Sequence, residues 1–505
     1  MAERINAVKT SFFGKGAIRL LGPELQKMGI RRALLVTDRF LYDSGAAARV
    51  GQVLSDAGVE YAVYYNVQPN PTVQVVNDCI AAARTLQVQL LVALGGGSAI
   101  DTAKAASIVV ACGGTVEQYE GENKSSKPGL PIVAVNTTAG TGSECTSFYI
   151  VTDPVRHSKM AMVDPNCMVS IAVNDTDFMS SMPPKLTAAT GMDALTHAIE
   201  AALSKNANPL TDKDAYWAMH AIVQNLPRAV ANGQDEAART MMAYAENVAG
   251  MAFSNAGLGM VHAMAHALGG HYNLPHGVCN AVLLPYVLAF NSRSPVCRER
   301  FMTIAAAMGL QGTFTPDTAA PAVIQFVRQL SAGVGIPANL AQLNKVDPAD
   351  FAALAELALH ATNAKRSLTD AVALDEAVKT ALGKVDLSDT LIVVTADHDH
   401  TMTINGYSAK GNPVLDLVKN GDGSTQNDVD GKPFTTLVFG NGPNRQDLRP
   451  TLTSNQVMGD DYLQETGVKL GSETHGGGDV MLFAGGAGSG RFKGTLDNTL
   501  VFGKL

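Results

Sequence analysis

Aspartate and histidine side chains recur at helical spacing in two segments of the chain. Asp193 and His197 lie four residues apart, His262 and His266 repeat that spacing, and His276 follows shortly afterwards. Residues four apart on a helix project from one face, so each pair can reach a common ion. A single histidine on an apolar helix is usually a packed core residue, but several histidines with an aspartate in two clusters indicate a metal site. One carboxylate with imidazoles suits Fe(II) or Zn(II), and the choice stays open.

A glycine-rich segment indicates a phosphate site. Gly95, Gly96, Gly97 and Ser98 follow an apolar strand and precede a stretch of helical pattern. Glycines let the backbone approach a ligand closely, and a helix N-terminus offers free N–H groups and partial positive charge. The alternative is a plain strand-to-helix turn. A second loop of this kind, residues 136–144, follows the next long strand and favours a dinucleotide site.

The choice of dinucleotide rests on Asp38, which ends the first strong strand. A carboxylate there can hold the ribose hydroxyls and would repel the extra phosphate of NADP, so NAD is favoured over NADP. The alternative for Asp38 is a helix N-cap before Phe40.

Two kinds of element must position these residues. Short apolar strands alternate with helical segments early in the chain, which predicts a parallel sheet covered on both faces; the strands are 33–37, 61–65, 90–94 and 131–135. After Pro183 and Pro184 the pattern becomes almost wholly helical, which predicts an all-α second domain with the active site in the cleft between the two; the helices are 186–203, 214–232, 235–254 and 316–332.

The last part of the chain changes character. Strand patterns return at 390–395, 434–439 and 479–484, and residues 410–432 are polar and loop-like. All six cysteines precede residue 300 and none forms a Cys-x-x-Cys pair, so we interpret them as buried thiols.

Composition narrows the function class. The chain has 505 residues, 46% of them hydrophobic and 17% charged, which fits two or three soluble globular domains. A net charge of −8 argues against nucleic-acid binding, and the longest apolar runs are too short to span a membrane. The first residues lack a secretory pattern, so we expect a cytoplasmic enzyme.

The motifs carry a family resemblance. The segments Gly95–Lys104, Thr190–Glu200 and His262–Gly277 resemble the iron-containing (group III) alcohol dehydrogenases, from about Phe12 to Leu359. The resemblance implies the dehydroquinate synthase-like fold of that family. It assigns the metal ligands to Asp193, His197, His262 and His276, and places His266 near the substrate, where it assists proton movement. It also implies a dinucleotide-lining set: Asp38, Asn70, Gly95, Gly96, Gly97, Ser98, Asp101, Thr137, Thr138 and Lys159.

The residues from 360 onward resemble the C-terminal part of a bacterial alkaline phosphatase. The likeness assigns vestigial zinc ligands to His360, Asp397, His398 and His475. The segment that would carry the serine nucleophile and the remaining metal ligands is missing. A two-metal phosphatase needs its nucleophile and both ions together, so we predict no phosphatase turnover, although zinc binding stays open.

Together these observations predict three domains: an α/β NAD-binding domain (1–184), an all-helical metal domain (185–359) and an incomplete α/β phosphatase fragment (360–505). The predicted function is NAD(P)-dependent interconversion of small primary alcohols and aldehydes by metal-assisted hydride transfer. A metal-dependent phosphomonoesterase and a catalytically dead fusion are the alternatives. We expect a homo-oligomer with no nucleic-acid or membrane partner. A natural fusion, an engineered chimera and an assembly error all stay open as origins.

Overall fold

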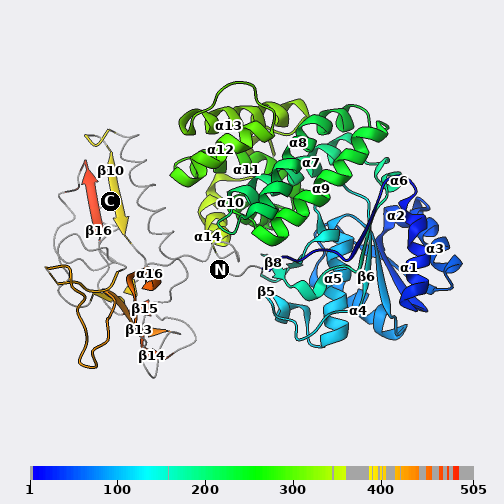
Figure 1. The fold of residues 1–505 in the computed structure, drawn as a ribbon, viewed down its shortest axis with the longest axis horizontal. Helices are drawn as coiled ribbons and strands as arrows, with labels where there is room; N and C mark the ends of the chain where they lie inside the picture. Colours follow the sequence, from blue (N-terminus) through cyan, green and yellow to red (C-terminus); the bar gives the residue numbers. More distant parts are fainter. Residues whose placement is uncertain are drawn as a thin grey trace. The chain divides into compact units, whose positions relative to one another are not determined.

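The fold is taken from a computed structural model, shown in Figure 1. The structure describes residues 4–156, 158–343, 346–359, 386–388, 390–395, 399–400, 402–404, 416–420, 422–442, 451–457, 466–469, 475–476, 482–487 and 489. It divides into two compact units, Met1–Lys365 and Arg366–Leu505, which are described separately.

A six-stranded parallel sheet forms the core of the first part of unit 1, as predicted. Its strand order is β1-β9-β6-β4-β2-β3, and every neighbouring pair is parallel. The four predicted strands are present, and β1 and β9 join them. The strands are β1 (Thr10–Phe13), β2 (Arg32–Asp38), β3 (Glu60–Val67), β4 (Leu90–Gly95), β6 (Ile132–Asn136) and β9 (Ile171–Asn174).

Alternate side chains of this sheet enter two separate cores. Leu35 and Val92 face α1 (Leu21–Met28) and α3 (Ala46–Asp56), whereas Leu34 and Leu91 face α4 (Val73–Thr85) and α5 (Gly97–Cys112). Because successive residues of a strand point to opposite faces, strands covered on both sides must be apolar throughout. The shorter elements of this sheet domain are η1 (Ala17–Leu20), α2 (Arg39–Asp43), η2 (Val116–Tyr119) and α6 (Thr176–Met179).

A smaller sheet lies beside α5 and brings polar side chains to the cleft. It consists of β5 (Gly121–Glu122), β8 (Ser158–Val163) and β7 (Phe148–Asp153), with β7 and β8 antiparallel. Two short turns flank it, η3 (Ser143–Cys145) and η4 (Pro165–Cys167). The sequence patterns did not identify this sheet.

The second part of unit 1 is helical, as predicted, and its first helix begins at Pro184. Pro184 opens α7 because proline suits the first turn of a helix, where no intrahelical N–H partner is lost. Its core is rich in alanine, which lets the helices approach closely. The helices are α7 (Pro184–Leu203), α8 (Pro209–Ala231), α9 (Glu236–Ala256), α10 (Met260–Tyr272), α11 (His276–Asn291), α12 (Pro295–Ala307), α13 (Pro316–Gly333), η5 (Leu340–Leu343), η6 (Pro348–Asp350) and α14 (Phe351–Leu359).

Unit 2 contains short strand pairs among its described residues. Of the predicted strands, 390–395 is found as β10, and β13 begins three residues later than predicted. Of the predicted strand 479–484, residues 482–484 belong to β16 and residues 479–481 lie outside the described residues. The polar stretch 410–432 holds isolated bridges such as Lys419 with Thr425. The elements are β10 (Leu391–Thr395), β11 (Asp399–His400), β12 (Met402–Ile404), β13 (Leu437–Gly442), α16 (Ser454–Val457), β14 (Thr466–Lys469), β15 (His475–Gly476) and β16 (Leu482–Gly486).

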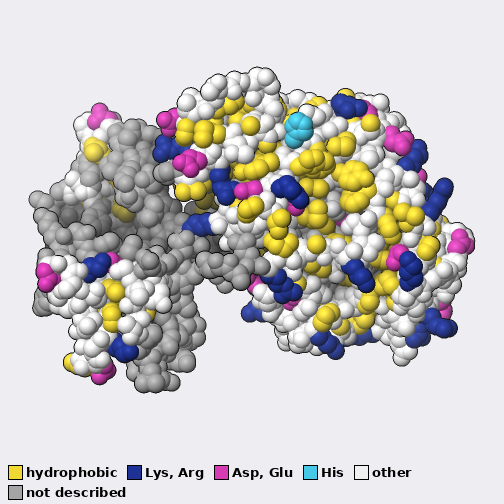
Figure 2. Space-filling view, in the orientation of Figure 1, with side chains coloured by type: hydrophobic (Ala, Val, Ile, Leu, Met, Phe, Trp, Pro, Cys, Tyr) yellow, Lys and Arg dark blue, Asp and Glu magenta, His cyan; other side chains and the backbone are white. Residues whose placement is uncertain are grey.

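The surface of unit 1 mixes charge signs. Figure 2 shows basic and acidic side chains interspersed over the visible face, with hydrophobic side chains scattered among them. Among the residues that the structure describes, no helix is both long and apolar enough to cross a bilayer.

Candidate metal centre and cofactor cleft

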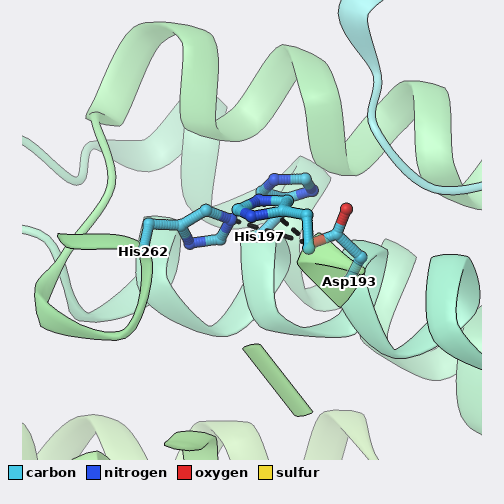
Figure 3. Close-up of side chains that lie close together, drawn as sticks. Asp193, His197 and His262 are labelled. Atoms are coloured by element: carbon cyan, nitrogen blue, oxygen red, sulfur yellow. Dashed lines mark ion pairs between the residues drawn. The ribbon is translucent and has the colours of Figure 1, made fainter. Parts of the chain in front are cut away.

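Four side chains of the helical domain converge on one point. Asp193 and His197 lie one turn apart on α7, His262 lies in the first turn of α10, and His276 is the first residue of α11. One ligand-type atom from each lies within 4.8 Å of all the others. The Asp193 Oδ1 atom is 3.8 Å from His262 Nε2 and 3.7 Å from His276 Nε2 (Figure 3). One carboxylate oxygen and three imidazole nitrogens at such spacing can hold a single divalent cation.

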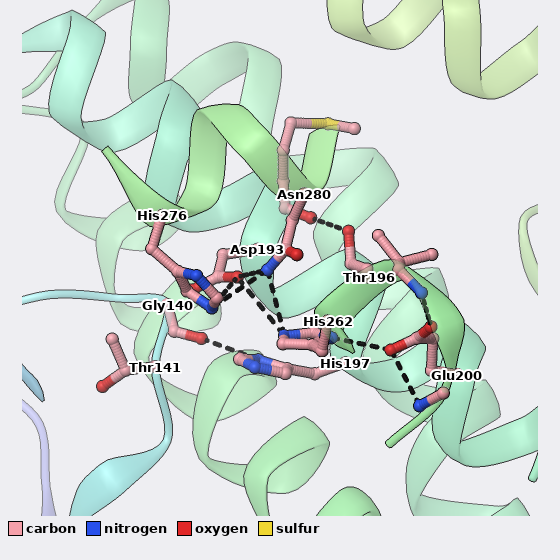
Figure 4. Close-up of polar contacts among 12 residues, drawn as sticks. Gly140, Thr141, Asp193, Thr196, His197, Glu200, His262, His276 and Asn280 are labelled. Carbon is pink, nitrogen blue, oxygen red and sulfur yellow. Dashed lines mark hydrogen bonds and ion pairs between the residues drawn. The ribbon is translucent and has the colours of Figure 1, made fainter. Parts of the chain in front are cut away.

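Two of the imidazole rings are oriented by hydrogen bonds at their Nδ1 atoms. The Nδ1 atom of His262 lies 2.6 Å from the Glu200 carboxylate, and that of His197 lies 3.2 Å from the Gly140 carbonyl oxygen (Figure 4). A ring nitrogen that donates to an oxygen leaves the opposite nitrogen as the lone-pair donor. Both histidines therefore direct Nε2 toward the shared point.

Asn280 lies inside the cluster. Its Nδ2 atom is 2.6 Å from Asp193 Oδ1, 3.0 Å from His262 Nε2 and 3.1 Å from His276 Nε2. Its Oδ1 atom and the Nδ1 atom of His276 are buried polar atoms without a hydrogen-bond partner among the described residues. Unpaired buried polar atoms are costly, so their presence at this point is typical of a site that accepts a ligand.

Burial sets the charge of the cluster. It lowers the pKa of His262 to about 3 and lowers the pKa values of His197 and His276 well below the ordinary value. The three rings are therefore neutral near pH 7, which is the form that binds metals. Burial also raises the pKa of Asp193 to about 7. A cation at the shared point would favour its ionised form.

A cleft connects this cluster to the parallel sheet. Its walls include Gly97, Ser98 and Asp101 from the start of α5, and Asn70 and Lys159 from the sheet side. His266 lines the helical side together with Phe148, Phe253 and Leu258. The ring centroids of His266 and His276 are 5.1 Å apart, so His266 lies beside the metal cluster without belonging to it.

The glycine loop is tightly packed. A Cβ atom on Gly96 would lie 2.8 Å from the Thr138 side chain, and one on Gly97 would lie 3.1 Å from Thr141. Gly95 has a φ of 155°, a conformation that side chains other than glycine rarely adopt. The glycines are therefore required by close contact between the two predicted loops.

The remaining predicted cofactor residues gather at the carboxyl edge of the sheet. Asp38 Oδ1 accepts a hydrogen bond of 2.8 Å from the Leu41 N–H and caps α2, which was the alternative for this residue. Thr137 and Thr138 follow β6, and the Thr137 N–H donates to the Gly95 carbonyl at 3.1 Å. Of the predicted set, Asp38, Gly95, Gly96, Thr137 and Thr138 are not among the residues that line the cleft.

Two polar contacts cross the mouth of the cleft. Lys159 Nζ donates to Asn70 Oδ1 at 2.8 Å, and Asn70 Nδ2 donates to Asn273 Oδ1 at 2.9 Å. Asn273 is the C-cap of α10 and lies three residues before His276. Lys159 and Asn70 thus connect the sheet domain to the metal-bearing helices.

Sequence reasoning missed Glu200, Gly140 and Asn280 as site residues. Glu200 carried a usable signal, because it is an acid on an almost wholly apolar helix, one turn after His197. Gly140 and Asn280 carried none, because their roles depend on contacts between distant segments. His271 is no part of the cluster: its side chain has an exposed fraction of 41%, and its Nε2 atom lies 3.4 Å from the Asp350 carboxylate.

The predicted phosphatase ligands cannot be placed in the same way. His360, Asp397 and His398 lie outside the described residues. His475 lies in β15, paired in register with His400.

Comparison with known families matches three stretches of the chain. A family model described as "Iron-containing alcohol dehydrogenase" matches residues 9–176, and one described as "Fe-containing alcohol dehydrogenase family, C-terminal" matches residues 187–377. A model described as "Alkaline phosphatase" matches residues 355–505. The change in character near residue 360 thus coincides with a change of family.

Individual relatives agree over the first part. The chain is 46% identical to the 1,3-propanediol dehydrogenase of Klebsiella pneumoniae, across 70% of this chain and 92% of that protein. It is 43% identical to the NAD-dependent methanol dehydrogenase of Bacillus methanolicus, across 66% and 87%. A solved 1,3-propanediol oxidoreductase aligns with a TM-score of 0.70 at 44% identity, covering 72% of this chain and 95% of that chain.

Proposed function

Because this chain belongs to the iron-containing alcohol dehydrogenase family over most of its length, we propose that Asp193, His197, His262 and His276 are the ligands of its catalytic metal. The chain is an NAD-dependent alcohol dehydrogenase that interconverts alcohols and aldehydes. The proposal concerns which of its residues do this, and with which metal and substrates.

The convergence of one oxygen and three neutral imidazole nitrogens is the observation that carries the proposal. This donor set suits Fe(II) or Zn(II). We favour Fe²⁺ as the resident ion because of the family. When bound, the cation supplies a Lewis acid that lowers the pKa of an alcohol hydroxyl group.

The chain's own residues orient and protect the substrate. Phe148, Phe253 and Leu258 form an apolar wall that favours a short carbon chain and excludes water. Burial, and the nearby charge of Lys159, lower the pKa of His266 well below its ordinary value. A neutral His266 can accept the hydroxyl proton and pass it on, and a bound nicotinamide would supply the hydride acceptor.

We assign the dinucleotide to the sheet edge. The N–H groups at the start of α5 would hold the pyrophosphate, and Lys159 and Asn70, which also line the cleft, would hold the nicotinamide half. Asp38 caps α2 with one oxygen, and the second carboxylate oxygen is free to hold a ribose hydroxyl. This supports NAD over NADP. In Asp38→Ala, the ratio of kcat/KM for NAD to that for NADP should fall by about tenfold, and an unchanged ratio would reject this role of Asp38.

The decisive experiment is alcohol-dependent NAD reduction by the purified full-length chain, reconstituted with Fe²⁺ or Zn²⁺ and supplied with ethanol or propanol. His262→Ala should abolish turnover, whereas His220→Ala, which changes an exposed histidine of α8, should leave it unchanged. Full activity in His262→Ala would reject the assignment. We also propose a cytoplasmic homo-oligomer, which size-exclusion chromatography with light scattering tests.

The match of residues 355–505 to alkaline phosphatase supports a second, weaker proposal. We infer that these residues can bind Zn²⁺ but do not turn over phosphate esters, because the nucleophile segment is missing. Soluble, metal-loaded full-length chain without dehydrogenase activity would instead favour the catalytically dead fusion.

A further inference from the structure

The segment from Asn136 to Thr146 touches both halves of the dehydrogenase unit. Its Ser143 hydroxyl donates to Asp101 of the sheet half at 2.7 Å, and its Gly140 carbonyl accepts from the His197 imidazole of the helical half. At Gly142 the segment also packs against α9, with no side chain between the two backbones. A Cβ atom on Gly142 would lie 2.7 Å from the Gly250 Cα atom, so the two backbones are in direct contact.

Two buried carboxyl groups join this segment to α9. Glu144, from the segment, and Glu246, from α9, both have an exposed fraction of 0%, and both accept from the Nδ2 atom of Asn136, Glu144 at 3.3 Å and Glu246 at 2.6 Å. Glu246 also accepts from the Gly142 N–H at 2.8 Å. Glu144 accepts from Asn247 Nδ2 at 2.5 Å. The carboxyl groups therefore lie at the centre of a network that ties the loop to the helix.

The charges around the pair allow only one negative charge. The nearby cation is Lys104, whose Nζ atom donates to Ser143 Oγ, to the Thr146 carbonyl and hydroxyl, and to the Phe148 carbonyl. It makes no hydrogen bond to either carboxyl group within the described structure. Two buried carboxyl groups that share one hydrogen-bond donor repel each other when both are ionised, so one of the pair retains its proton. Burial raises the pKa values of both groups, and the pKa of the neighbouring Cys145 thiol is also raised by burial.

We propose that Glu144 and Glu246 share one proton, and that this carboxyl pair is a positioning device that holds the Gly140 carbonyl on His197 by fixing the loop against α9. Neither residue touches substrate, cofactor or metal. They act through Gly142, which lies two residues from Gly140. The Gly142 N–H donates to the Glu246 carboxyl group. The positioning part rests on the proposed metal role of His197, whereas the shared proton does not.

The shared proton is tested by infrared spectroscopy of the full-length, metal-free chain at pH 8. Wild type should show the carbonyl stretch of a buried carboxylic acid, and Glu246→Gln should lose it, because the glutamine keeps a donor to Glu144 without an ionisable group. A spectrum in which Glu246→Gln removes no acid band would overturn the proposal.

The positioning role is tested by Zn²⁺ affinity, measured by competition with a chromophoric chelator. Glu246→Met has a similar volume but offers neither acceptor nor donor, so it should weaken Zn²⁺ binding by about tenfold, as loss of an outer-shell contact does. Glu246→Gln keeps one acceptor but sets its NH₂ group against the donor of Asn136 or Gly142, so it should bind Zn²⁺ more tightly than Glu246→Met without reaching wild-type affinity. Asn225→Ala, a buried polar change on α8 away from the loop, is the matched control and should have no effect.

Equal Zn²⁺ affinity in wild type and Glu246→Met would overturn the positioning role. If wild type itself binds no Zn²⁺, the proposed metal centre fails, and the infrared comparison still decides the shared proton. Should Glu246→Met not fold, Glu144→Met replaces it, and Zn²⁺ binding as tight as in wild type would again overturn the role.

Discussion

Replacing Glu200 tests the metal centre through a residue that does not touch the ion. Glu200 is buried on α7; its Oε2 atom accepts from His262 Nδ1 at 2.6 Å and from the Gly259 N–H at 3.0 Å, and its Oε1 atom accepts from the Val261 N–H at 2.6 Å. The carboxylate thus holds the first turn of α10 and the imidazole in one geometry. We predict that Glu200→Gln weakens the binding of divalent metal.

The magnitude follows from the three donors. With its oxygen toward His262, the glutamine places its NH₂ group against the Val261 N–H; with the opposite orientation, the NH₂ group faces His262 and Gly259. One donor-to-donor conflict is unavoidable, and the remaining bond to His262 loses its charge assistance. Loss of such support typically costs 10- to 100-fold in metal affinity, so we expect about tenfold, or about 1.4 kcal/mol, for glutamine and about 100-fold for alanine.

The assay is titration of metal-free full-length protein with Zn²⁺ against a chromophoric chelator, followed by turnover at limiting and saturating metal. Saturating metal should restore kcat in Glu200→Gln, because the ligands themselves are intact. Thr196→Val is the control, since Thr196 is buried on the same helix but its hydroxyl bonds the Met192 carbonyl of its own helix. Glu200→Gln and Thr196→Val with the same affinity as wild type would refute the reasoning.

Three further predictions follow from the same geometry. Burial raises the pKa of Glu200 to about 7, so the folded metal-free protein retains a proton there that the unfolded chain releases. The melting temperature of wild type minus that of Glu200→Gln should therefore fall as pH rises from about 4 to about 7, because this difference cancels the opposite contribution of the buried histidines, whose pKa values are lowered. A difference that is flat across that window would contradict the prediction. Gly96→Ala should raise KM for NAD about tenfold, because its Cβ atom would lie 2.8 Å from Thr138, and an unchanged KM would show that the loop can yield. The full-length chain should release no phosphate from a chromogenic phosphate ester, and steady release that survives His262→Ala would contradict this prediction.

The parallel sheet and the long helices could be predicted because their burial is periodic in the sequence. Leu90–Leu94 is buried on both faces, so every position is apolar and the strand is visible without alternation. The smaller sheet was missed for the opposite reason. β7 and β8 alternate between buried and partly buried positions over only six residues each, and Lys159 carries its charge into the cleft. Short strands with functional polar residues give a weak pattern.

The proposed metal ligands could be predicted because two ligands on one face of a helix lie four residues apart, as Asp193 and His197 do. The residues that orient them could not, because no spacing links Gly140 to His197 or Asn280 to Asp193. Asp38 shows a related limit. Its position at the end of β2 fits both a helix cap and a ribose contact. The structure shows the cap, and the ribose contact stays a prediction.

The contacts of unit 1 also connect the site to residues 346–359, where the match to the alkaline phosphatase family model begins. Every predicted metal and dinucleotide residue of the dehydrogenase lies before α12, but α10 ends against the last described segment of this unit. Tyr272 donates to the Asp350 carboxylate, and His271 Nε2 lies 3.4 Å from the same residue.

These contacts are four to five residues from His276, the proposed ligand that begins α11. Residues 346–359 can therefore shift His276 without touching the proposed metal site, whereas Asp193 and His197 lie on α7 and contact Asn280 and the Gly140 carbonyl. If the segment that matches alkaline phosphatase disturbs the enzyme, we expect it first to weaken the binding of the metal by His276. The affinity for Zn²⁺ in Asp350→Asn should then fall, as it would in a chain whose α14 is displaced, while an unchanged affinity would separate the tail from the site.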